Sequence, residues 1–306
     1  MYKKRQADVF ASEIAEVLNL DLNGDDFIVK EPGSVKDLKE GTVVLLGPLE
    51  KETALSNKRK ILAVVSPGQI ENKVEFSYIV SLKPRLAFVR ILNEFFVEKN
   101  VRLTEPTARI APGARIGVNV YIGNNSVVGP DVVIGDNTII LNNVVITGQV
   151  LIGKNCVIKD NSTIGSEGYS FEFDEELRPI HVPYLGRIII ADNVWVGSNT
   201  SIERAEIDDT VIEAFVKIDD LVQIGQNCYI GERSMIASGT VVSANVRLGK
   251  DCWLAPNVSI RDKIEIGDNV FVGIGGVVVK DLAPGGVYVG NPAKFLRPRH
   301  AGESNG

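Results

Sequence analysis

An aliphatic residue recurs at every sixth position over most of the chain after residue 109. The stride runs unbroken from Ile110 to Ile164, resumes at Ile190, and holds from Ile212 to Val278 after a slip of four residues. A helix, with its shorter period, would scatter these residues around its surface. A simple strand, in which the faces alternate, would not need one special position in six. A period of six therefore indicates neither of these structures.

A triangular coil explains the period, since each six-residue unit then forms one flat side and points its aliphatic residue to the axis. Three units close a turn of about 18 residues, and the turns stack through parallel strand pairing. Glycine often follows the aliphatic residue, as at Gly117 and Gly225, and we attribute it to a bend with positive φ. The fifth position is small or apolar, as at Ser126 and Val222. The predicted fold class is mainly β, a parallel β-helix of hexapeptide repeats.

The first hundred residues lack the stride and predict a small α/β domain. Apolar stripes predict two helices, one with Val9, Phe10, Ile14, Val17 and Leu18, and one opening at Pro84 with Leu86, Val89, Leu92 and Phe96. Strands are expected at residues 43–46, 61–65 and 76–80. The predicted domains are a cap at 1–100, the coil at 101–284 with an excursion loop at 166–187, and a closing segment and tail at 285–306. We expect the tail to be disordered from His300.

Composition and charge exclude several classes of protein. The net charge of −6 argues against nucleic-acid binding, which needs a basic surface. We expect no membrane span, because no apolar run approaches about 20 residues, and a cytoplasmic location, because the start does not resemble a signal peptide. Cys156, Cys228 and Cys252 occupy the fifth position of their repeats, so we expect them to pack inside the coil. Two histidines are too few for a zinc site with three imidazole ligands, and no metal is expected.

The excursion between Ile164 and Ile190 is too long for a bare bend. It carries Tyr169, Phe171 and His181, and long loops on a rigid scaffold commonly carry function. We assign Tyr169 and Phe171 to substrate binding and His181 to catalysis. The alternatives are a loop that only packs against a neighbouring subunit and an ordinary surface imidazole.

Three blocks of sequence carry a resemblance to a known family. They are Gly165-Ser-Glu-Gly-Tyr, Asn199-Thr-Ser-Ile-Glu-Arg and Val216-Lys-Ile-Asp-Asp-Leu-Val-Gln-Ile-Gly-Gln-Asn. Together with the cap and the coil, they resemble the UDP-3-O-acylglucosamine N-acyltransferases of lipid A synthesis over nearly the whole chain. The resemblance implies a left-handed coil and a homotrimer with its sites between neighbouring coils.

The chain also departs from that family. Gln226 stands where the family has its base histidine, and Lys263 stands where it has a second histidine, whereas Asp219 matches the acidic partner. The nucleotide-stacking aromatic residue and the helical C-terminal extension have no counterpart. The ending Gly290-Asn-Pro-Ala-Lys instead resembles CoA-dependent sugar acetyltransferases.

These matches give the remaining expected site residues. Gln226 and Asp219 are expected in catalysis, Asn227 in substrate binding, and four residues in binding the acyl donor: Ala244, Lys263, Arg297 and Arg299. The alternatives are a surface glutamine, a solvated carboxylate and solvated tail arginines. An amide cannot accept a proton near neutral pH, although it can donate and accept hydrogen bonds.

The missing histidine favours acylation of nitrogen over acylation of oxygen. General base catalysis contributes roughly 10²–10⁴-fold, and a sugar hydroxyl could hardly do without it. An amine with a pKa of about 8 is already partly unprotonated. The hypothesis is an N-acyltransferase that moves an acyl group from acyl-CoA to the amine of a nucleotide-linked aminosugar. Acyl-CoA would be a co-substrate, and no tightly bound cofactor is expected. The alternatives are a lipid A N-acyltransferase that uses acyl carrier protein and a non-catalytic scaffold.

Overall fold

The computed structural model describes residues 4–47, 55, 60–98 and 104–300. The chain divides into two compact units, residues 1–100 and 101–306. Apart from His300, the tail expected to be disordered lies outside the described residues. In the described part of the chain, no helix is long and apolar enough to cross a membrane.

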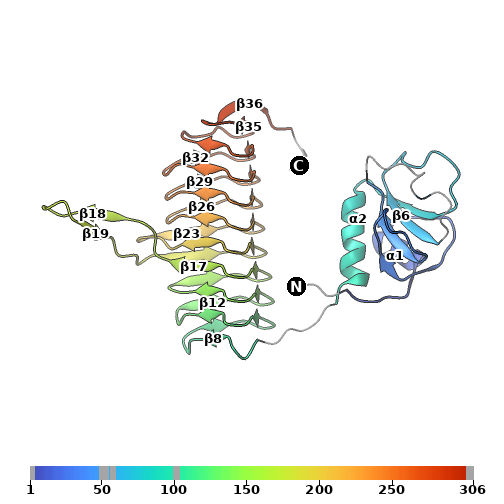
Figure 1. Ribbon diagram of the computed structural model, residues 1–306, viewed down its shortest axis with the longest axis horizontal. Helices are drawn as coiled ribbons and strands as arrows, with labels where there is room; N and C mark the ends of the chain where they lie inside the picture. The colour runs from blue at the N-terminus through green and yellow to red at the C-terminus, as the bar shows by residue number, and fades with distance from the viewer. Residues whose placement is uncertain (1–3, 48–54, 56–59, 99–103, 301–306) are drawn as a thin grey trace. The chain divides into compact units, whose positions relative to one another are not determined.

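The first unit is a small α/β domain around a five-stranded sheet of order β2-β7-β6-β5-β4, in which only β2 runs antiparallel to its neighbour (Figure 1). Its strands and helices are β1 (Val9–Phe10), α1 (Ala11–Leu18), β2 (Leu22–Asn23), β3 (Ile28–Val29), β4 (Glu31–Pro32), β5 (Thr42–Leu45), β6 (Ile61–Val65), β7 (Ser77–Val80), α2 (Pro84–Ile91) and the π-helical turn η2 (Leu92–Phe96). Every residue of β6 is buried, because the residues of this central strand contribute alternately to two apolar clusters. The three main strands fall within one residue of the ranges predicted from the sequence.

The two predicted helical stripes are only partly right. Helix α1 buries Ile14 as expected, but Phe10 and Val17 are exposed. The chain is still extended at Phe10, before the helix begins, and the buried face of the helix is completed by Ala11 and Ala15. In α2 the prediction is wrong for Leu86 and Val89, which are exposed. The buried face of α2 consists of Ala87 and Ile91, four residues apart.

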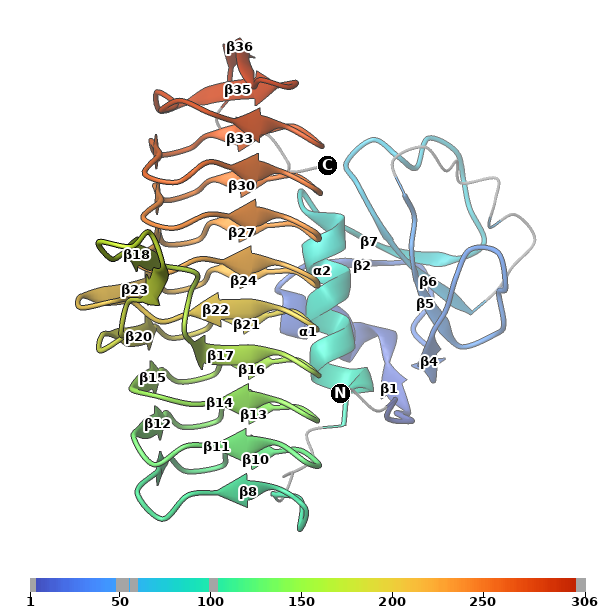
Figure 2. The same cartoon turned by 60° about the vertical axis from the view of Figure 1, so that its left-hand side comes forward.

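The second unit is a left-handed parallel β-helix whose three sides are flat parallel sheets (Figures 1 and 2). The nine-stranded sheet contains β8 (Arg109–Ile110), β11 (Val127–Val128), β14 (Val145–Ile146), β17 (Thr163–Ser166), β22 (Ser201–Glu203), β25 (Gln223–Ile224), β28 (Val241–Val242), β31 (Ser259–Ile260) and β34 (Val277–Val278). The eight-stranded sheet contains β9 (Arg115–Ile116), β12 (Val132–Ile134), β15 (Val150–Ile152), β20 (Arg187–Ile190), β23 (Asp209–Ile212), β26 (Tyr229–Ile230), β29 (Arg247–Leu248) and β32 (Glu265–Ile266). The ten-stranded sheet contains β10 (Tyr121–Ile122), β13 (Ile139–Ile140), β16 (Val157–Ile158), β21 (Trp195–Val196), β24 (Lys217–Ile218), β27 (Met235–Ile236), β30 (Trp253–Leu254), β33 (Phe271–Val272), β35 (Gly286–Val289) and the antiparallel β36 (Lys294–Pro298).

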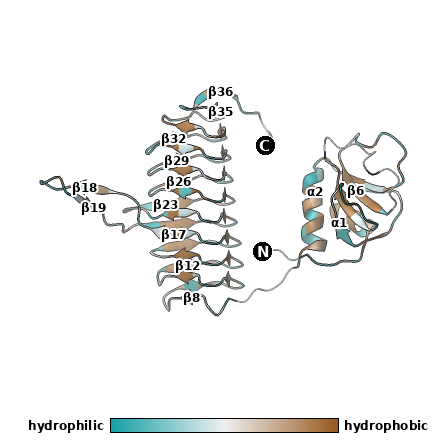
Figure 3. Cartoon of the chain, viewed as in Figure 1, coloured by the Kyte–Doolittle hydropathy of each residue, from teal (hydrophilic) through white to brown (hydrophobic). Residues whose placement is uncertain are grey.

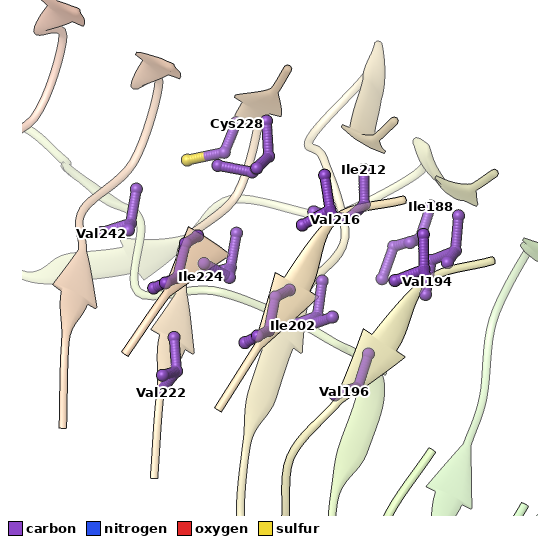
Figure 4. Packing of buried hydrophobic residues seen from close by; sticks show 14 of the residues in the cluster. Ile188, Val194, Val196, Ile202, Ile212, Val216, Val222, Ile224, Cys228 and Val242 are labelled. Atoms are coloured by element: carbon purple, nitrogen blue, oxygen red, sulfur yellow. The ribbon is translucent and has the colours of Figure 1, made fainter. Parts of the chain in front are cut away.

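The aliphatic stride forms the core of the coil. Val128 pairs with Ile146 one turn later, and Ile122 pairs with Ile140, so like positions stack directly. Figure 4 shows Ile202, Ile224 and other inward side chains packed between the strands of successive turns, and Figure 3 shows hydrophobic residues recurring in those strands. The predicted inward positions are buried except at the first turn, where Ile110 is exposed. The predicted fold class is thereby confirmed.

The predicted reason for the bend glycines is wrong. Gly117, Gly225 and most other glycines that directly follow the inward residue do not have positive φ; Gly165, where the excursion begins, is an exception with φ of 97°. The regular bend instead has the left-handed conformation two residues after the glycine, mostly at asparagine, as at Asn119 and Asn155. Asparagine tolerates this conformation better than most residues. Glycine is needed after the inward residue for space, because a Cβ on Gly231 would lie 2.5 Å from the Gly249 backbone of the next turn.

The cysteines pack inside the coil as expected. Cys156, Cys228 and Cys252 are buried in its core. Burial raises the pKa of Cys228 to about 12 and that of Cys252 to about 11, so both thiols stay protonated near neutral pH. The nucleophile is the thiolate, so these cysteines stabilise the fold and do not carry chemistry.

Candidate active site

Both breaks in the sixfold stride lie at one corner of the coil, between the nine-stranded and the eight-stranded sheet. The excursion leaves after β17 and returns at β20, and the four-residue slip lies between β22 and β23. We call this edge the loop corner; in later turns it consists of residues 225–228, 243–246 and 261–264. The other two edges, which we call the regular corners, contain no insertion from Ile116 to Val278. The breaks therefore mark one edge of the coil as different.

The excursion forms a hairpin that projects from the coil (Figure 1). Its strands β18 (Phe171–Phe173) and β19 (Pro179–His181) pair antiparallel, with Phe171 opposite His181. The ring centroids of Tyr169 and Phe171 lie 5.0 Å apart, and those of Phe171 and His181 lie 5.3 Å apart. Tyr184 is buried and stacks on His181 at 5.7 Å. The three loop residues predicted to be functional thus form one aromatic cluster at the base of the hairpin.

Glu167 joins this cluster to the coil. Its carboxylate pairs with Arg204 of the next turn and lies 3.6 Å from Nε2 of His181. The ion pair with Arg204 fixes the root of the loop beside the four-residue slip. His181 therefore stands near an acidic side chain that can orient its imidazole.

Gln226 lies against the root of the loop. Its side chain is only 7% exposed, which excludes the alternative of a surface glutamine. A Cβ on Gly168 would lie 2.5 Å from Gln226 Oε1, so only glycine lets the loop backbone come this close. The structure brings Gln226 to the base of the loop that carries His181, although the two are far apart in the sequence.

Two predicted donor-binding residues share the loop corner with Gln226. The Asn245 backbone N–H donates to the Gln226 carbonyl at 2.9 Å, and the Lys263 N–H donates to the Ala244 carbonyl at 3.0 Å. Ala244 and Lys263 therefore follow Gln226 in successive turns. They form a column along one edge of the coil.

Asn227 has a structural task at this corner. It is one of the left-handed asparagines, its Nδ2 donates to Asn245 Oδ1 at 3.2 Å, and its Oδ1 accepts from the Glu206 N–H at 3.2 Å. These bonds occupy the amide that was assigned to substrate binding.

Asp219 and the tail arginines stand elsewhere on the coil. Asp219 is exposed at a regular corner, between β24 and β25, so it lies one side of the triangle away from Gln226 within a single chain. Arg299 donates to the carbonyls of Asp251 and Val270 at 2.9 and 3.3 Å, and Arg297 donates to the Pro298 carbonyl. The structure of one chain does not bring these three residues to Gln226.

A hollow of about 540 Å³ adjoins the loop corner on the N-terminal side of the hairpin. It is lined by Gly113, Arg115, Pro130, Asp131, Val132, Val133, Gln149, Leu151 and Arg187. Among the residues that the structure describes, no group of three or more His, Cys, Asp or Glu side chains could hold a metal ion.

The chain was compared with known families, curated proteins and solved structures. The family of bacterial transferase hexapeptides (six repeats) matches residues 209–244, and the family described as the GMPPB C-terminal domain matches residues 97–169. The second unit is a hexapeptide-repeat β-helix. Solved structures of UDP-N-acetylglucosamine acyltransferases share its fold. The enzyme from Campylobacter jejuni has a TM-score of 0.57 at 19% identity, over 64% of this chain and 75% of that one. The enzyme from Francisella novicida has a TM-score of 0.55 at 24% identity, over 64% and 69%.

The hexapeptide-repeat β-helix also has curated relatives. A UDP-3-O-acylglucosamine N-acyltransferase of Methylococcus capsulatus is 35% identical over 143 residues, which are 46% of this chain and 40% of the relative. One from Delftia acidovorans is 34% identical over 127 residues, 42% and 38% of the two chains. The matches thus span about two fifths of these relatives.

Two residues at the loop corner of this hexapeptide-repeat β-helix, Gly168 and Glu203, were not predicted as site residues from the sequence. A Cβ on Gly168 would also lie 2.8 Å from Glu203 Oε2, so Glu203 stands beside Gln226. Glu203 is the last residue of β22, where the four-residue slip begins. The four-residue slip could have pointed to Glu203, because residues at a break in a strict repeat do not have to pack inside the coil.

Proposed function

We propose that the chain is an N-acyltransferase that moves an acyl group from a thioester to the amine of a nucleotide-linked aminosugar. The observation that carries the proposal is the burial of Gln226 against Gly168. Gln226, which stands at the position of the family's histidine, lies beneath the loop that leaves the coil after β17. The relatives named UDP-3-O-acylglucosamine N-acyltransferase support the same chemistry.

The roles of the site residues follow from their chemistry. The Gln226 amide orients the acceptor or donates to the thioester oxygen as negative charge develops on it. The aromatic side chains of Tyr169 and Phe171, respectively 89% and 39% exposed, offer surface to the nucleotide-linked sugar. Ala244 and Lys263 extend the same edge toward the acyl donor.

We propose acyl-CoA as the donor, on the basis of the ending Gly290–Lys294. Arg299 already binds two backbone carbonyls, so the Lys263 ammonium is the better partner for a CoA phosphate. The second candidate is a lipid A N-acyltransferase that uses acyl carrier protein, which is favoured by the names of the relatives.

We also propose a homotrimer in the cytoplasm. Asp219 is exposed and lies at a different corner from Gln226, so a neighbouring chain is needed to bring an Asp219 carboxylate to the site. Light scattering should then give about three times the chain mass of 33.2 kDa. A mass near 33.2 kDa at micromolar concentration would contradict the trimer.

Acyl transfer by the purified chain tests the proposal. UDP-3-O-acylglucosamine is incubated with acyl-CoA or with acyl carrier protein loaded with the same acyl group. Thiol release is followed in solution, and the product is identified by mass spectrometry. We expect an amide product that forms faster from acyl-CoA. A faster reaction with the carrier protein would favour the second candidate. If neither thioester is cleaved, the result would favour the alternative of a non-catalytic scaffold.

A further inference from the structure

The Glu203 carboxylate is held at the loop corner one turn before Gln226. Nε2 of Gln223 donates to Glu203 Oε1 at 3.1 Å. The Gln226 backbone N–H also hydrogen-bonds the Glu203 carboxylate. Glu203 is half-buried, so its carboxylate is fixed in place and still reachable from outside.

Gly168 shows that three groups converge on one point. A Cβ at this position would lie 2.5 Å from Gln226 Oε1 and 2.8 Å from Glu203 Oε2. Any side chain there would displace the amide or the carboxylate. Glycine at the root of the loop thus lets the backbone close over a carboxylate and an amide that lie side by side.

The electrostatic surroundings of Glu203 suit a proton acceptor. Burial raises the pKa of its carboxyl group, although the hydrogen bonds from Gln223 and Gln226 oppose the rise. The neighbouring cation, Arg204, is paired with Glu167. The other titratable groups that interact with Glu203 are the buried Cys228 thiol and the Tyr184 phenol. A carboxylate in such surroundings is a stronger base than one held by an arginine.

We propose that Glu203 is the general base of the transfer; this inference rests on the proposed function. The amine nitrogen attacks the thioester carbonyl carbon and forms the N–C bond, and its proton passes to the Glu203 carboxylate. The C–S bond then breaks, and the departing thiolate takes the proton from the Glu203 carboxylic acid. The products are an amide and a thiol, Glu203 is restored, and no further reactant is consumed. The Gln226 amide next to it positions the acceptor.

The replacement Glu203→Gln tests this assignment in the full chain. It keeps the shape of the side chain and its capacity to accept from Gln223, but it removes the base. With UDP-3-O-acylglucosamine and the donor that the wild type prefers, we expect kcat to fall by roughly 10²–10³-fold, with KM and the melting temperature little changed. Glu203→Asp, which keeps a carboxylate, should retain part of the activity. Glu232→Gln, at a regular corner, is the control and should keep wild-type activity.

The pH profile separates a base from a structural residue. A base must be ionised, so the wild-type kcat should show, below the fall caused by protonation of the acceptor amine, a second fall through the raised pKa of Glu203. This second fall should vanish in Glu203→Gln, whereas the fall caused by the amine should remain. If the wild type transfers acyl groups and Glu203→Gln keeps its rate within threefold, this inference alone is overturned. If the wild type transfers no acyl group to this acceptor, the proposed function is overturned and the inference with it.

Discussion

The loop corner and the regular corners are built from the same hexapeptide, but between Ile116 and Val278 only the loop corner contains insertions. At several bends of the regular corners, a side chain of the next turn accepts a hydrogen bond from the backbone of the bend. Asp136 Oδ1 accepts from the Val118 N–H at 2.9 Å, and Asn142 Oδ1 accepts from the Asn124 N–H at 2.9 Å. At the loop corner the Glu206 N–H makes a similar bond to Asn227 Oδ1, and the insertions bring Glu167, Glu203 and Gln226 to the edge. We therefore propose that the chemistry of this solenoid centres on the loop corner, whereas the regular corners mainly stabilise the coil.

Deleting the hairpin should have the largest effect on activity. The Val182 N–H donates to the Ser170 carbonyl at 3.0 Å, so residues 171–181 can be replaced by two glycines without separating the ends. All residues of β18 and β19 are exposed, and we therefore expect the melting temperature to be preserved. We expect kcat/KM to fall by roughly 10³-fold, because the loop positions the acceptor and carries His181. Unchanged kcat/KM in a folded variant would mean that the hairpin takes no part in the reaction.

Removing the Gln226 amide should have a smaller effect. We expect Gln226→Ala to lower kcat/KM by roughly 10–100-fold, since a neutral hydrogen bond is worth about 1–2 kcal/mol. The control is Glu232→Ala, at the equivalent position of a regular corner, which should match the wild type. If His181→Ala abolishes turnover while Gln226→Ala leaves it intact, the chemistry belongs to the hairpin instead of the coil.

Two bend glycines should differ in what they contribute to stability. A Cβ on Gly231 would meet the Gly249 backbone at 2.5 Å, whereas a Cβ on Gly129, at the loop corner, would meet nothing closer than 3.3 Å. We expect Gly231→Ala to destabilise the coil by about 1–3 kcal/mol. Gly129→Ala should cost less than about 1 kcal/mol, and thermal unfolding of both variants measures the difference. Equal melting temperatures would contradict the spatial explanation of the bend glycines.

The smallest expected effect is a gain in stability. Leu221 has φ of 62° at a regular corner where asparagine is usual, and it is exposed. Leu221→Asn should raise the free energy of unfolding by about 0.5–1 kcal/mol, because asparagine adopts this conformation at lower cost. A lower melting temperature would show that Leu221 makes an apolar contact with a neighbouring chain.

The sequence predicts the coil well because each inward residue, such as Ile122 or Ile224, repeats one local rule. It does not predict the role of the bend glycines, since their constraint comes from the backbone of the next turn. The same holds for the site. Gln226 was found through its resemblance to a family motif, whereas Glu203 was missed because its neighbours, Gly168 and Gln226, meet it only in the folded coil.

Hydrogen exchange of the wild-type chain with and without UDP-3-O-acylglucosamine tests the central claim most directly. The claim is that this ligand binds at the loop corner. We therefore expect new protection in peptides covering residues 167–187, 203–208 and 225–228. Exchange should be unchanged at the regular corner between the eight-stranded and ten-stranded sheets, in peptides such as 231–234 and 249–252. Protection confined to the regular corners, or no protection at a saturating concentration of the ligand, would contradict the account.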